Sequence, residues 1–399
     1  MGLLAAIKRI AVSCLVAFNW AYAFFSRHYK IHRARFARVD ELAKLMAESF
    51  DRDPSLTLGI GNLSQVLRVR PVKSRRELGN MLVVAPTRGG KGLLATAQLL
   101  TWPHSVVVND IKREFWDQTS GWREKELHGR SFIFDPRGLG HKFDPLEGRT
   151  TDSDLRSAAT ILLHRPREGE NAVFTERAIT MLTQIFHAAK LEKQRALPFT
   201  YKIFNEGLYG IATILKLISD KHHCYPDLAT KFLDTTYDKA DFDSKFLQDC
   251  YSTMTARVSN ILTKETVRCF TGSDFSGAEI ITSGKSPISL YLSWPERDIL
   301  TLGPLIELVW DCLISDMVEA YDKAKGEGCS RTLLVLDEIF RSGMRKLPEY
   351  TTTVCGRNIS ILLSAHQISS LLAHVRPFIR YAVSQPDGSR IDTLGLRTY

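Results

Sequence analysis

A glycine-rich turn with a single lysine stands between an apolar run and a helical pattern, over residues 80–97. The turn reads Val84-Ala-Pro-Thr-Arg-Gly-Gly-Lys91-Gly and is close to the P-loop pattern G-x-x-x-x-G-K-[ST]. The backbone N–H groups and the lysine of a P-loop meet phosphates, and its hydroxyl helps to hold Mg²⁺. Two positions depart from the pattern, because Ala85 replaces the first glycine and Gly92 replaces the Ser or Thr. The alternative is an ordinary strand-to-helix turn that uses its glycines as breakers.

An acidic pair ends a second apolar run far downstream, in Leu333-Leu-Val-Leu-Asp337-Glu338. This is the pattern of a Walker B element, in which Asp337 holds Mg²⁺ directly or through water. Glu338 is expected to orient and polarise the water that attacks the γ-phosphate in line. Because an acidic pair at a strand end is also a common helix cap, the assignment depends on the P-loop upstream. Together the two motifs predict a site for ATP and Mg²⁺.

Arg357 and Gln367 flank a third apolar run, Ile359–Ala365. Arg357 precedes the run and would neutralise transition-state charge as an arginine finger, a role that also operates across subunit interfaces. Gln367 follows the run at its carboxyl end, where a sensor of the γ-phosphate belongs. The alternatives are an ordinary surface arginine and a loop amide. We predict catalytic roles for Glu338, Arg357 and Gln367, a metal-binding role for Asp337, and nucleotide binding by Pro86, Thr87, Arg88, Gly89, Gly90, Lys91, Gly92 and Leu93.

Apolar runs alternate with helical patterns around these motifs, which predicts a doubly wound α/β sheet. Ligands of such sheets bind at the carboxyl ends of the strands, where Asp110 and Asp135 are expected. Residues 151–283 instead carry long amphipathic patterns with few β-branched runs, which predicts a mainly helical insertion. The strands are expected at 105–112, 131–136, 287–294, 332–338, 359–365 and 379–385.

An uncharged run, Ile10–Ser26, precedes the α/β region. As a helix it would span roughly 25 Å, slightly less than a bilayer core of about 30 Å. Aromatic residues gather at its end, and five cations follow before any acidic residue, which favours a membrane anchor with the rest of the chain in the cytoplasm. The alternatives are a cleavable secretory signal and a helix buried in the soluble core. The aromatic residues at the end of the run are Trp20, Tyr22, Phe24 and Phe25, and the cations that follow it are Arg27, Lys30, Arg33, Arg35 and Arg38.

Composition narrows the class of protein and its partners. A chain of 399 residues is long enough for two or three domains, and a net charge of +9 with a pI of about 9.1 favours anionic partners. Its seven cysteines are scattered without a C-x-x-C pair, which argues for a reducing compartment and against a disulfide scaffold. His222-His223-Cys224 lacks a second ligand pair and is expected to be a polar loop rather than a metal site.

The ordered series of motifs resembles the type IV secretion coupling proteins, the membrane-bound DNA-transfer ATPases of conjugation. In that family, alanine at the start of the P-loop and glycine after its lysine are familiar variants. The resemblance covers roughly residues 80–385. It is carried by Val83-Val-Ala-Pro-Thr-Arg-Gly-Gly-Lys91-Gly, Leu99-Leu-Thr-Trp-Pro, Ser105-Val-Val-Val-Asn-Asp-Ile-Lys112, Phe134-Asp-Pro, Phe143-Asp-Pro-Leu146, Asp274-Phe, Ser289-Leu-Tyr-Leu, Leu336-Asp-Glu, Arg357 and Gln367.

The resemblance implies a RecA-type P-loop ATPase domain interrupted by an all-α domain and anchored by an N-terminal transmembrane helix. It implies a homo-hexameric ring at the bacterial inner membrane, with its catalytic part in the cytoplasm. The ring would receive single-stranded DNA with its relaxase, or an effector protein, and pass it to a type IV secretion channel. It carries function onto Lys91, Asp337, Glu338, Arg357 and Gln367. The expected divisions are an anchor and basic flank at 1–36, a linker at 37–66, the nucleotide-binding domain at 67–150 and 284–399, and the all-α domain at 151–283.

Two other functions fit parts of the sequence. A non-catalytic receptor would bind nucleotide and only dock substrates to the channel, and the missing hydroxyl at Gly92 favours it. A DNA pump of the chromosome-partitioning kind would share the ATPase motifs, but the helical insertion after Phe143-Asp-Pro-Leu argues against it. Many coupling proteins have two transmembrane helices and some have an extended tail. The single candidate span and the end at Tyr399 are expected for a compact variant or a truncated product.

Overall fold

The computed structural model describes residues 55–60, 66–69, 78–86, 88–163, 172–224, 227–342, 344–354 and 356–366. All of them lie in the second of two units into which the chain divides, residues 48–399. Within these ranges, no helix combines the length and the apolar character that a membrane crossing requires. The expected anchor at Ile10–Ser26, the expected strand at 379–385, Thr87 and Gln367 all lie outside the described residues.

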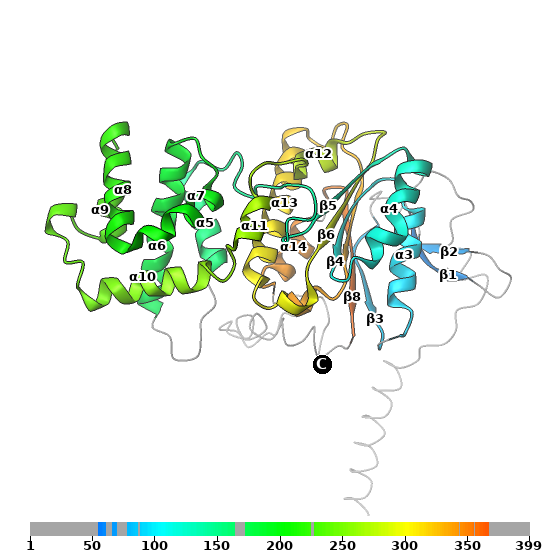
Figure 1. Cartoon of the computed structure of the whole chain (residues 1–399). Coiled ribbons are helices and arrows are strands. Elements are labelled where there is room, and N and C mark those ends of the chain that lie inside the picture. Colours follow the sequence, from blue (N-terminus) through cyan, green and yellow to red (C-terminus); the bar gives the residue numbers. More distant parts are fainter. Residues whose placement is uncertain are drawn as a thin grey trace, which may run out of the picture. The chain divides into compact units, whose positions relative to one another are not determined.

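A six-stranded, entirely parallel sheet organises the described α/β region (Figure 1). The sequence expectation of an α/β fold with a parallel sheet is thereby confirmed. Because all strands run the same way, their carboxyl ends meet at one edge of the sheet. In spatial order the strands are β3 (Met81–Val84), β8 (Ile359–Ala365), β7 (Thr332–Leu336), β4 (Ser105–Asp110), β6 (Ile288–Ser293) and β5 (Arg130–Phe134).

Helices cover both faces of this sheet, so its central strands β7, β4 and β6 are buried along their whole length (Figure 1). Along β4, Val106 and Val108 belong to one buried cluster and Val107 to the other, as the alternation of a strand requires. The first cluster includes residues of α3 (Lys91–Thr101) and α4 (Glu114–Leu127), and the second includes residues of α12 (Gly277–Thr282) and α13 (Gly303–Lys323). The site-bearing strands are therefore fixed from both sides.

A buried arginine secures the end of α3, the helix that begins in the P-loop. The fully buried guanidinium of Arg123 donates to the carbonyl oxygens of Leu99 at 2.6 Å and Trp102 at 2.9 Å, and also to that of His104. Burial lowers the pKa of Arg123 to about 10, so the group still carries its charge at neutral pH. A cation at the carboxyl end of a helix is favourable because the last carbonyl groups lack partners within the helix.

The described residues between β5 and β6 form helices and no strand. The longest of these helices is Ala172–Leu191, whereas two shorter helices, Ala196–Ile203 and Gly207–His222, follow it separately. The break between the two lies where Gly207 adopts a φ of +68°, which an ordinary helical residue does not. The helices of this segment are α5 (Asp152–Leu163), α6 (Ala172–Leu191), α7 (Ala196–Ile203), α8 (Gly207–His222), α9 (Leu228–Leu233), α10 (Lys245–Val258), α11 (Lys264–Cys269) and α12.

The helical segment shares its hydrophobic core with one face of the sheet. Its α5 packs against α13, and residues of α5 and α6 belong to the same buried cluster as α13. The buried Asp144 carboxylate, in the segment that leads out of the sheet, accepts a hydrogen bond from Arg195 at 3.0 Å. The helices are therefore tied to the sheet by apolar packing and by an ion pair.

A small antiparallel sheet forms where the sequence predicted only a linker. Its strands are β1 (Leu56–Ile60) and β2 (Val66–Val69), so it crosses the expected boundary at residue 66. The sheet is held against α3, because Gln98 donates its side-chain amide to the carbonyl oxygen of Thr57 at 2.7 Å. One further α-helix, α14 (Leu347–Thr353), lies between β7 and β8 in the sequence.

Candidate active site

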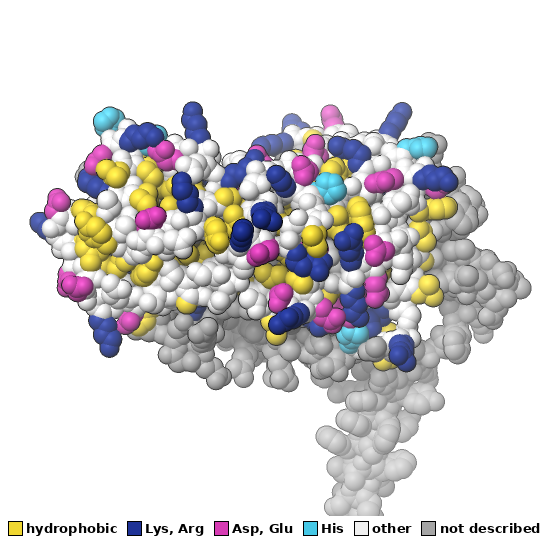
Figure 2. All heavy atoms as spheres, viewed as in Figure 1, with side chains coloured by type: hydrophobic (Ala, Val, Ile, Leu, Met, Phe, Trp, Pro, Cys, Tyr) yellow, Lys and Arg dark blue, Asp and Glu magenta, His cyan; other side chains and the backbone are white. Residues whose placement is uncertain are grey.

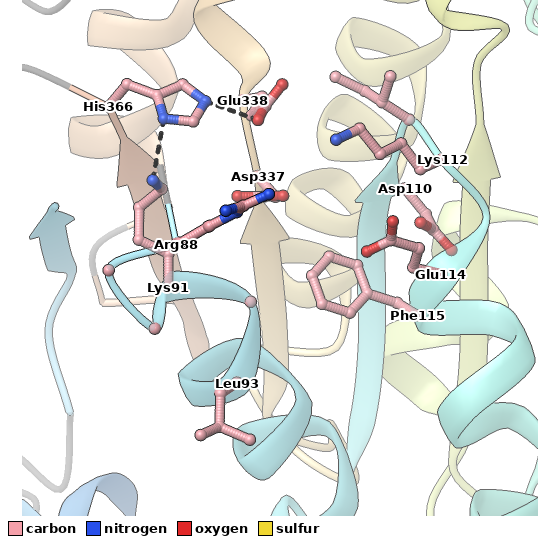
Figure 3. Close-up of a pocket in the computed structure, with 14 residues that line it drawn as sticks. Arg88, Lys91, Leu93, Asp110, Lys112, Glu114, Phe115, Asp337, Glu338 and His366 are labelled. Atoms are coloured by element: carbon pink, nitrogen blue, oxygen red, sulfur yellow. Dashed lines mark hydrogen bonds and ion pairs between the residues drawn. The ribbon is translucent and has the colours of Figure 1, made fainter. Parts of the chain in front are cut away.

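The P-loop and the acidic pair meet at the carboxyl edge of the sheet (Figure 3). The P-loop follows β3, the pair Asp337-Glu338 follows β7, and both line a cavity of about 410 Å³. In Figure 3, Lys91 and Glu338 lie on one side of this cavity, while Asp110 and Phe115 lie across from them. The lining residues are Arg88, Gly89, Gly90, Lys91, Gly92, Leu93, Asp110, Ile111, Lys112, Glu114, Phe115, Asp337, Glu338 and His366.

The turn between β3 and α3 has the backbone geometry of an anion cradle. Gly90 adopts a φ of +85° as the N-cap of α3 and provides no side-chain cap, and the first turn of the helix carries no acidic residue. A Cβ at Gly89 would lie 2.9 Å from the Ala85 Cβ and 2.9 Å from the Pro86 carbonyl oxygen, so only glycine fits there. The N–H groups at the start of α3 are therefore exposed to an anion in the cavity.

The ammonium group of Lys91 is fixed by three acceptors. It donates to the carbonyl oxygens of Ala85 at 2.7 Å and Pro86 at 3.1 Å, and to the Nδ1 atom of His366 at 3.0 Å. Only 8% of the lysine is exposed. Phosphate oxygens in the cavity would compete with these neutral acceptors, and a charged acceptor makes the stronger hydrogen bond.

The two carboxylates of the acidic pair have opposite electrostatic environments. Burial raises the pKa of Asp337, although a hydrogen bond donated by Ser364 opposes this effect. Burial would also raise the pKa of Glu338, but hydrogen bonds from Arg341 and His366 outweigh it and hold that pKa below its ordinary value. Glu338 is therefore an anion at neutral pH, as an acceptor for the proton of an attacking water requires.

Glu338 is also held in an uncommon backbone conformation. Its φ of +49° lies in the left-handed region, which few residues other than glycine occupy. Strain of this kind persists where surrounding contacts fix a side chain, and it is frequent at functional sites. Here the contacts are the ion pair with Arg341 at 2.8 Å and the hydrogen bond with His366 at 2.7 Å.

His366 is a site residue that the sequence analysis missed. Its Nδ1 faces Lys91, and its Nε2 lies 2.7 Å from Oε1 of Glu338 (Figure 3). Because an ammonium group has only donors, Nδ1 must accept, and the ring proton then resides on Nε2 and is donated to Glu338. The imidazole thus links the P-loop lysine to the carboxylate that the sequence predicts to activate water. Its position directly after the predicted strand 359–365 was the available signal.

A comparison with protein families shows to which family the chain belongs. The model of the type IV secretory system conjugative DNA transfer family matches residues 43–373. The chain belongs to this family. Its curated relatives include a conjugal transfer protein TraG of Escherichia coli, 24% identical over 317 residues, which cover 73% of this chain and 48% of TraG. Protein VirD4 of Rhizobium radiobacter is 24% identical over 318 residues, which cover 74% of this chain and 43% of VirD4.

Solved structures agree with the fold of a conjugative DNA transfer protein. The plasmid coupling protein TrwB in complex with ADP and Mg²⁺ aligns with a TM-score of 0.59 and 16% identity, covering 85% of this chain and 73% of the TrwB chain. TrwB in complex with a non-hydrolysable ATP analogue aligns with a TM-score of 0.56 and 17% identity. The chain spans about half the length of the curated relatives that it matches.

The residues of the cavity suit Mg²⁺ bound together with a nucleotide. Mg²⁺ is held through one or two carboxylates, phosphate oxygens and water rather than by a cage of protein ligands. Asp337 and Glu338 supply carboxylates beside the P-loop turn, with Asp110 across the cavity. Among the described residues, no group of three or more His, Cys, Asp or Glu side chains is arranged to bind a metal ion alone. The donor set therefore fits a metal that arrives with its nucleotide.

Arg357 lies apart from Lys91, Asp337 and Glu338. Arg357 precedes β8, so it lies at the amino edge of the sheet, opposite the P-loop. Its guanidinium is bound to Asp322 at the end of α13, at 2.9 Å and 3.1 Å. Within one chain it does not reach the cavity. Asp135 is also outside the cavity, at the end of edge strand β5, where Arg137 pairs with it.

Asp110 provides a pH-dependent test of the cavity. Burial raises its pKa to about 6, although the backbone N–H of Trp116 donates to it at 2.8 Å. The folded chain then binds a proton that the unfolded chain releases near pH 4, so this group's contribution to stability is complete below that pH and is lost as the pH rises through about 6. Relative to Asp110→Asn, the wild type should lose about 3 kcal/mol of unfolding free energy across this range.

The measurement is denaturant unfolding of both proteins between about pH 4 and pH 7.5 without nucleotide or metal. Asp117→Asn is the matched control, because Asp117 lies exposed on α4, the helix that follows β4. A difference between wild type and Asp110→Asn that stays constant with pH would show that this carboxyl group is not desolvated.

Proposed function

We propose that the chain is a membrane-anchored ATPase that couples ATP hydrolysis to the delivery of DNA, or of a DNA–protein complex, into a type IV secretion channel during conjugation. The observation that carries the proposal is the convergence of Lys91, Asp337 and Glu338 on one cavity in a member of the conjugative DNA transfer family. The names of the relatives, conjugal transfer protein and plasmid coupling protein, support the cellular process.

The proposed cofactors are ATP and Mg²⁺. The cradle of residues 86–93, with Lys91, would bind the phosphates, and Asp337 would hold the metal, which neutralises charge that develops on the transferring phosphoryl group. Glu338 would orient the attacking water and accept its proton. Bound ADP and Mg²⁺ in TrwB support this choice of cofactors.

A ring of several copies would give Arg357 a catalytic role. Because Arg357 lies at the edge opposite its own P-loop, the cavity that it could complete belongs to a neighbouring chain. A homo-hexamer with nucleotide between subunits would provide this arrangement, and Arg357 would then stabilise transition-state charge in trans. Gln367, next to His366 in the sequence, remains proposed as a sensor of the γ-phosphate.

The proposed domain organisation follows from the expected functions of each segment. Residues 67–150 and 284–399 would form a RecA-type ATPase domain, with an all-α domain at 151–283 inserted into it. Residues 1–36 would anchor the chain in the bacterial inner membrane, and residues 37–66 would link this anchor to a cytoplasmic catalytic part. The described residues between β5 and β6 form helices and no strand, which supports the insertion.

The proposed partners are single-stranded DNA, a relaxase or effector protein, and components of the secretion channel. On the face shown in Figure 2, lysine and arginine side chains are spread among acidic ones rather than confined to one element. The net charge of +9 over the whole chain favours contact with an anionic polymer without sequence specificity.

A non-catalytic substrate receptor is the second candidate function. It is favoured by Gly92, which leaves the P-loop without a hydroxyl for the metal. The ordering of Glu338 by Arg341 and His366 favours the ATPase instead, because a receptor has no need of a positioned base. A chromosome-partitioning pump is disfavoured by the helices between β5 and β6.

ATP turnover with and without DNA distinguishes these functions. Single-stranded DNA should raise the rate of phosphate release by the purified full chain several-fold, and this stimulation should weaken steeply with added salt because it depends on phosphate contacts. The measurement is steady-state phosphate release, with Glu338→Gln as the control for contaminating ATPases. A chain that binds MgATP as a ring and yet releases no phosphate with DNA would be a receptor.

A further inference from the structure

The absence of a P-loop hydroxyl is not imposed by space. Gly92 lies in the first turn of α3 with a φ outside the left-handed region, so the backbone accepts any residue. A Cβ built on Gly92 would meet no atom within 4 Å. The site therefore has room for a serine side chain at this position.

A hydroxyl is present beside Asp337, on the neighbouring strand. Ser364 lies near the carboxyl end of β8, which pairs with β7 on one side and with the P-loop strand β3 on the other. Its partner in the register with β3 is Val83, close to the start of the P-loop. Its Oγ donates a hydrogen bond to Oδ1 of Asp337.

The orientation of Ser364 follows from the alternation of β8. Leu362, two residues earlier on the same face, belongs to the buried cluster that contains Ala95 and Leu99 of α3. Ser364 therefore faces the side of the sheet that the P-loop helix covers. It is 5% exposed, so its hydroxyl is withdrawn from bulk water and has Asp337 as its acceptor.

The backbone of Asp337 is fixed independently of Ser364. Asn109 donates its side-chain amide to the carbonyl oxygen of Asp337 at 2.7 Å, and the indole N–H of Trp294 holds the other end of this amide at 3.1 Å. These contacts place the residue but do not determine the rotation of its carboxylate. Among the described side chains, Ser364 is the one that hydrogen-bonds to this carboxylate.

We propose that Ser364 supplies, from β8, the hydroxyl that the P-loop lacks at Gly92. It acts as a positioning residue that holds Oδ1 of Asp337 and leaves the second carboxylate oxygen for Mg²⁺ or for the waters around it. The inference rests on the proposed function, because it concerns the metal of the nucleotide. Removal of a group that orients a metal-binding side chain typically lowers the metal affinity about ten- to a hundredfold.

The test measures metal affinity directly. Mn²⁺, which replaces Mg²⁺ at oxygen sites, is titrated into the full chain in the presence of ADP, and free Mn²⁺ is followed by electron paramagnetic resonance. Ser364→Ala should raise the Mn²⁺ dissociation constant about ten- to a hundredfold. The affinity for a fluorescent ADP analogue without metal should stay unchanged, since Ser364 contacts the metal-binding carboxylate and not the phosphate cradle.

Two further variants separate the hydroxyl from a merely structural effect. Gly92→Ser together with Ser364→Ala should restore most of the Mn²⁺ affinity, because it returns a hydroxyl to the place for which the P-loop has room. Gly92→Ser alone should change the affinity less than it does in the Ser364→Ala background, as a double-mutant cycle of two exchangeable groups requires. Ser360→Ala is the matched control. Ser360 is a buried serine on the same face of β8, and it lies two residues further from the site than Leu362.

The outcomes distinguish the inference from the proposed function. Equal Mn²⁺ affinity of Ser364→Ala and wild type would overturn the inference, as would an equal loss of metal-free ADP binding. The inference would also be overturned if Gly92→Ser restored no Mn²⁺ affinity to Ser364→Ala and if Ser364→Thr, which keeps a hydroxyl, lost as much affinity as Ser364→Ala. A hydroxyl would then not be the missing group. If the wild type bound ADP and Mn²⁺ at no concentration, the proposed function itself would fail. Loss of Mn²⁺ affinity in Ser364→Ala, with recovery in the double variant, supports the assignment.

Discussion

Lys91→Ala should lower the affinity of the chain for ATP by about a hundredfold or more, because it removes a cationic side chain that is hydrogen-bonded within the P-loop turn and lines the cavity. The ammonium group is almost fully buried, so the phosphates would lose a charge-assisted contact that water replaces poorly. The affinity is measured with a fluorescent ATP analogue at fixed Mg²⁺.

Lys125→Ala is the control for this experiment, since Lys125 is an exposed lysine on α4 outside the cavity. Lys91→Arg is informative as well, because it keeps the charge but replaces a compact ammonium with a planar fork. Unchanged ATP affinity in Lys91→Ala would mean that the glycine-rich turn is an ordinary strand-to-helix connection.

Glu338→Gln should lower ATP turnover by about two to four orders of magnitude while leaving ATP affinity nearly intact, as loss of a general base predicts. The amide keeps the shape of the side chain and can still bond to His366, but it cannot accept the proton of the attacking water. Single-turnover phosphate release and equilibrium ATP binding, measured on the same preparation, give the two quantities separately.

Glu296→Gln is the matched control for Glu338→Gln. Both carboxylates accept a hydrogen bond from Arg341 at 2.8 Å, so each substitution disturbs the same arginine. Glu296 does not line the cavity, and its replacement should leave turnover within a few-fold of wild type. Similar losses in the two variants would assign the effect to Arg341 rather than to a base.

The central strands were predictable because they are buried on both faces. β4 and β7 are continuous apolar runs that end in polar residues, and this pattern places Asp110 and Asp337 at the carboxyl edge without knowledge of the strand order. The P-loop was predictable despite Ala85, because Ala85 does not adopt a positive φ and alanine is tolerated there. Lys91 and Glu338 consequently lie at one cavity.

The contacts between strands were not predictable, because they depend on the order of the strands in the sheet. β8 lies between β3 and β7, which brings His366 to Lys91 and Ser364 to Asp337. Neither residue belongs to a motif, and a lone histidine or serine at a strand end has no distinctive spacing.

The small sheet of β1 and β2 was missed because its strands are only five and four residues long and their patterns are weak. Arg357 was predicted to be an arginine finger, a role that also operates across subunit interfaces. It lies at the edge opposite the P-loop because it precedes a parallel strand, and its role at a neighbouring chain's cavity stays a prediction.

The measurement that tests the central claim most directly is the frequency of DNA transfer from donor cells whose only copy of this chain carries Glu338→Gln, with Glu296→Gln donors as the matched control. Membrane fractions are assayed in parallel to establish equal amounts of each variant. If ATP hydrolysis at this cavity drives delivery, transfer from Glu338→Gln donors should fall to the level of donors without the chain, while Glu296→Gln donors transfer normally. Normal transfer from Glu338→Gln donors would contradict the account.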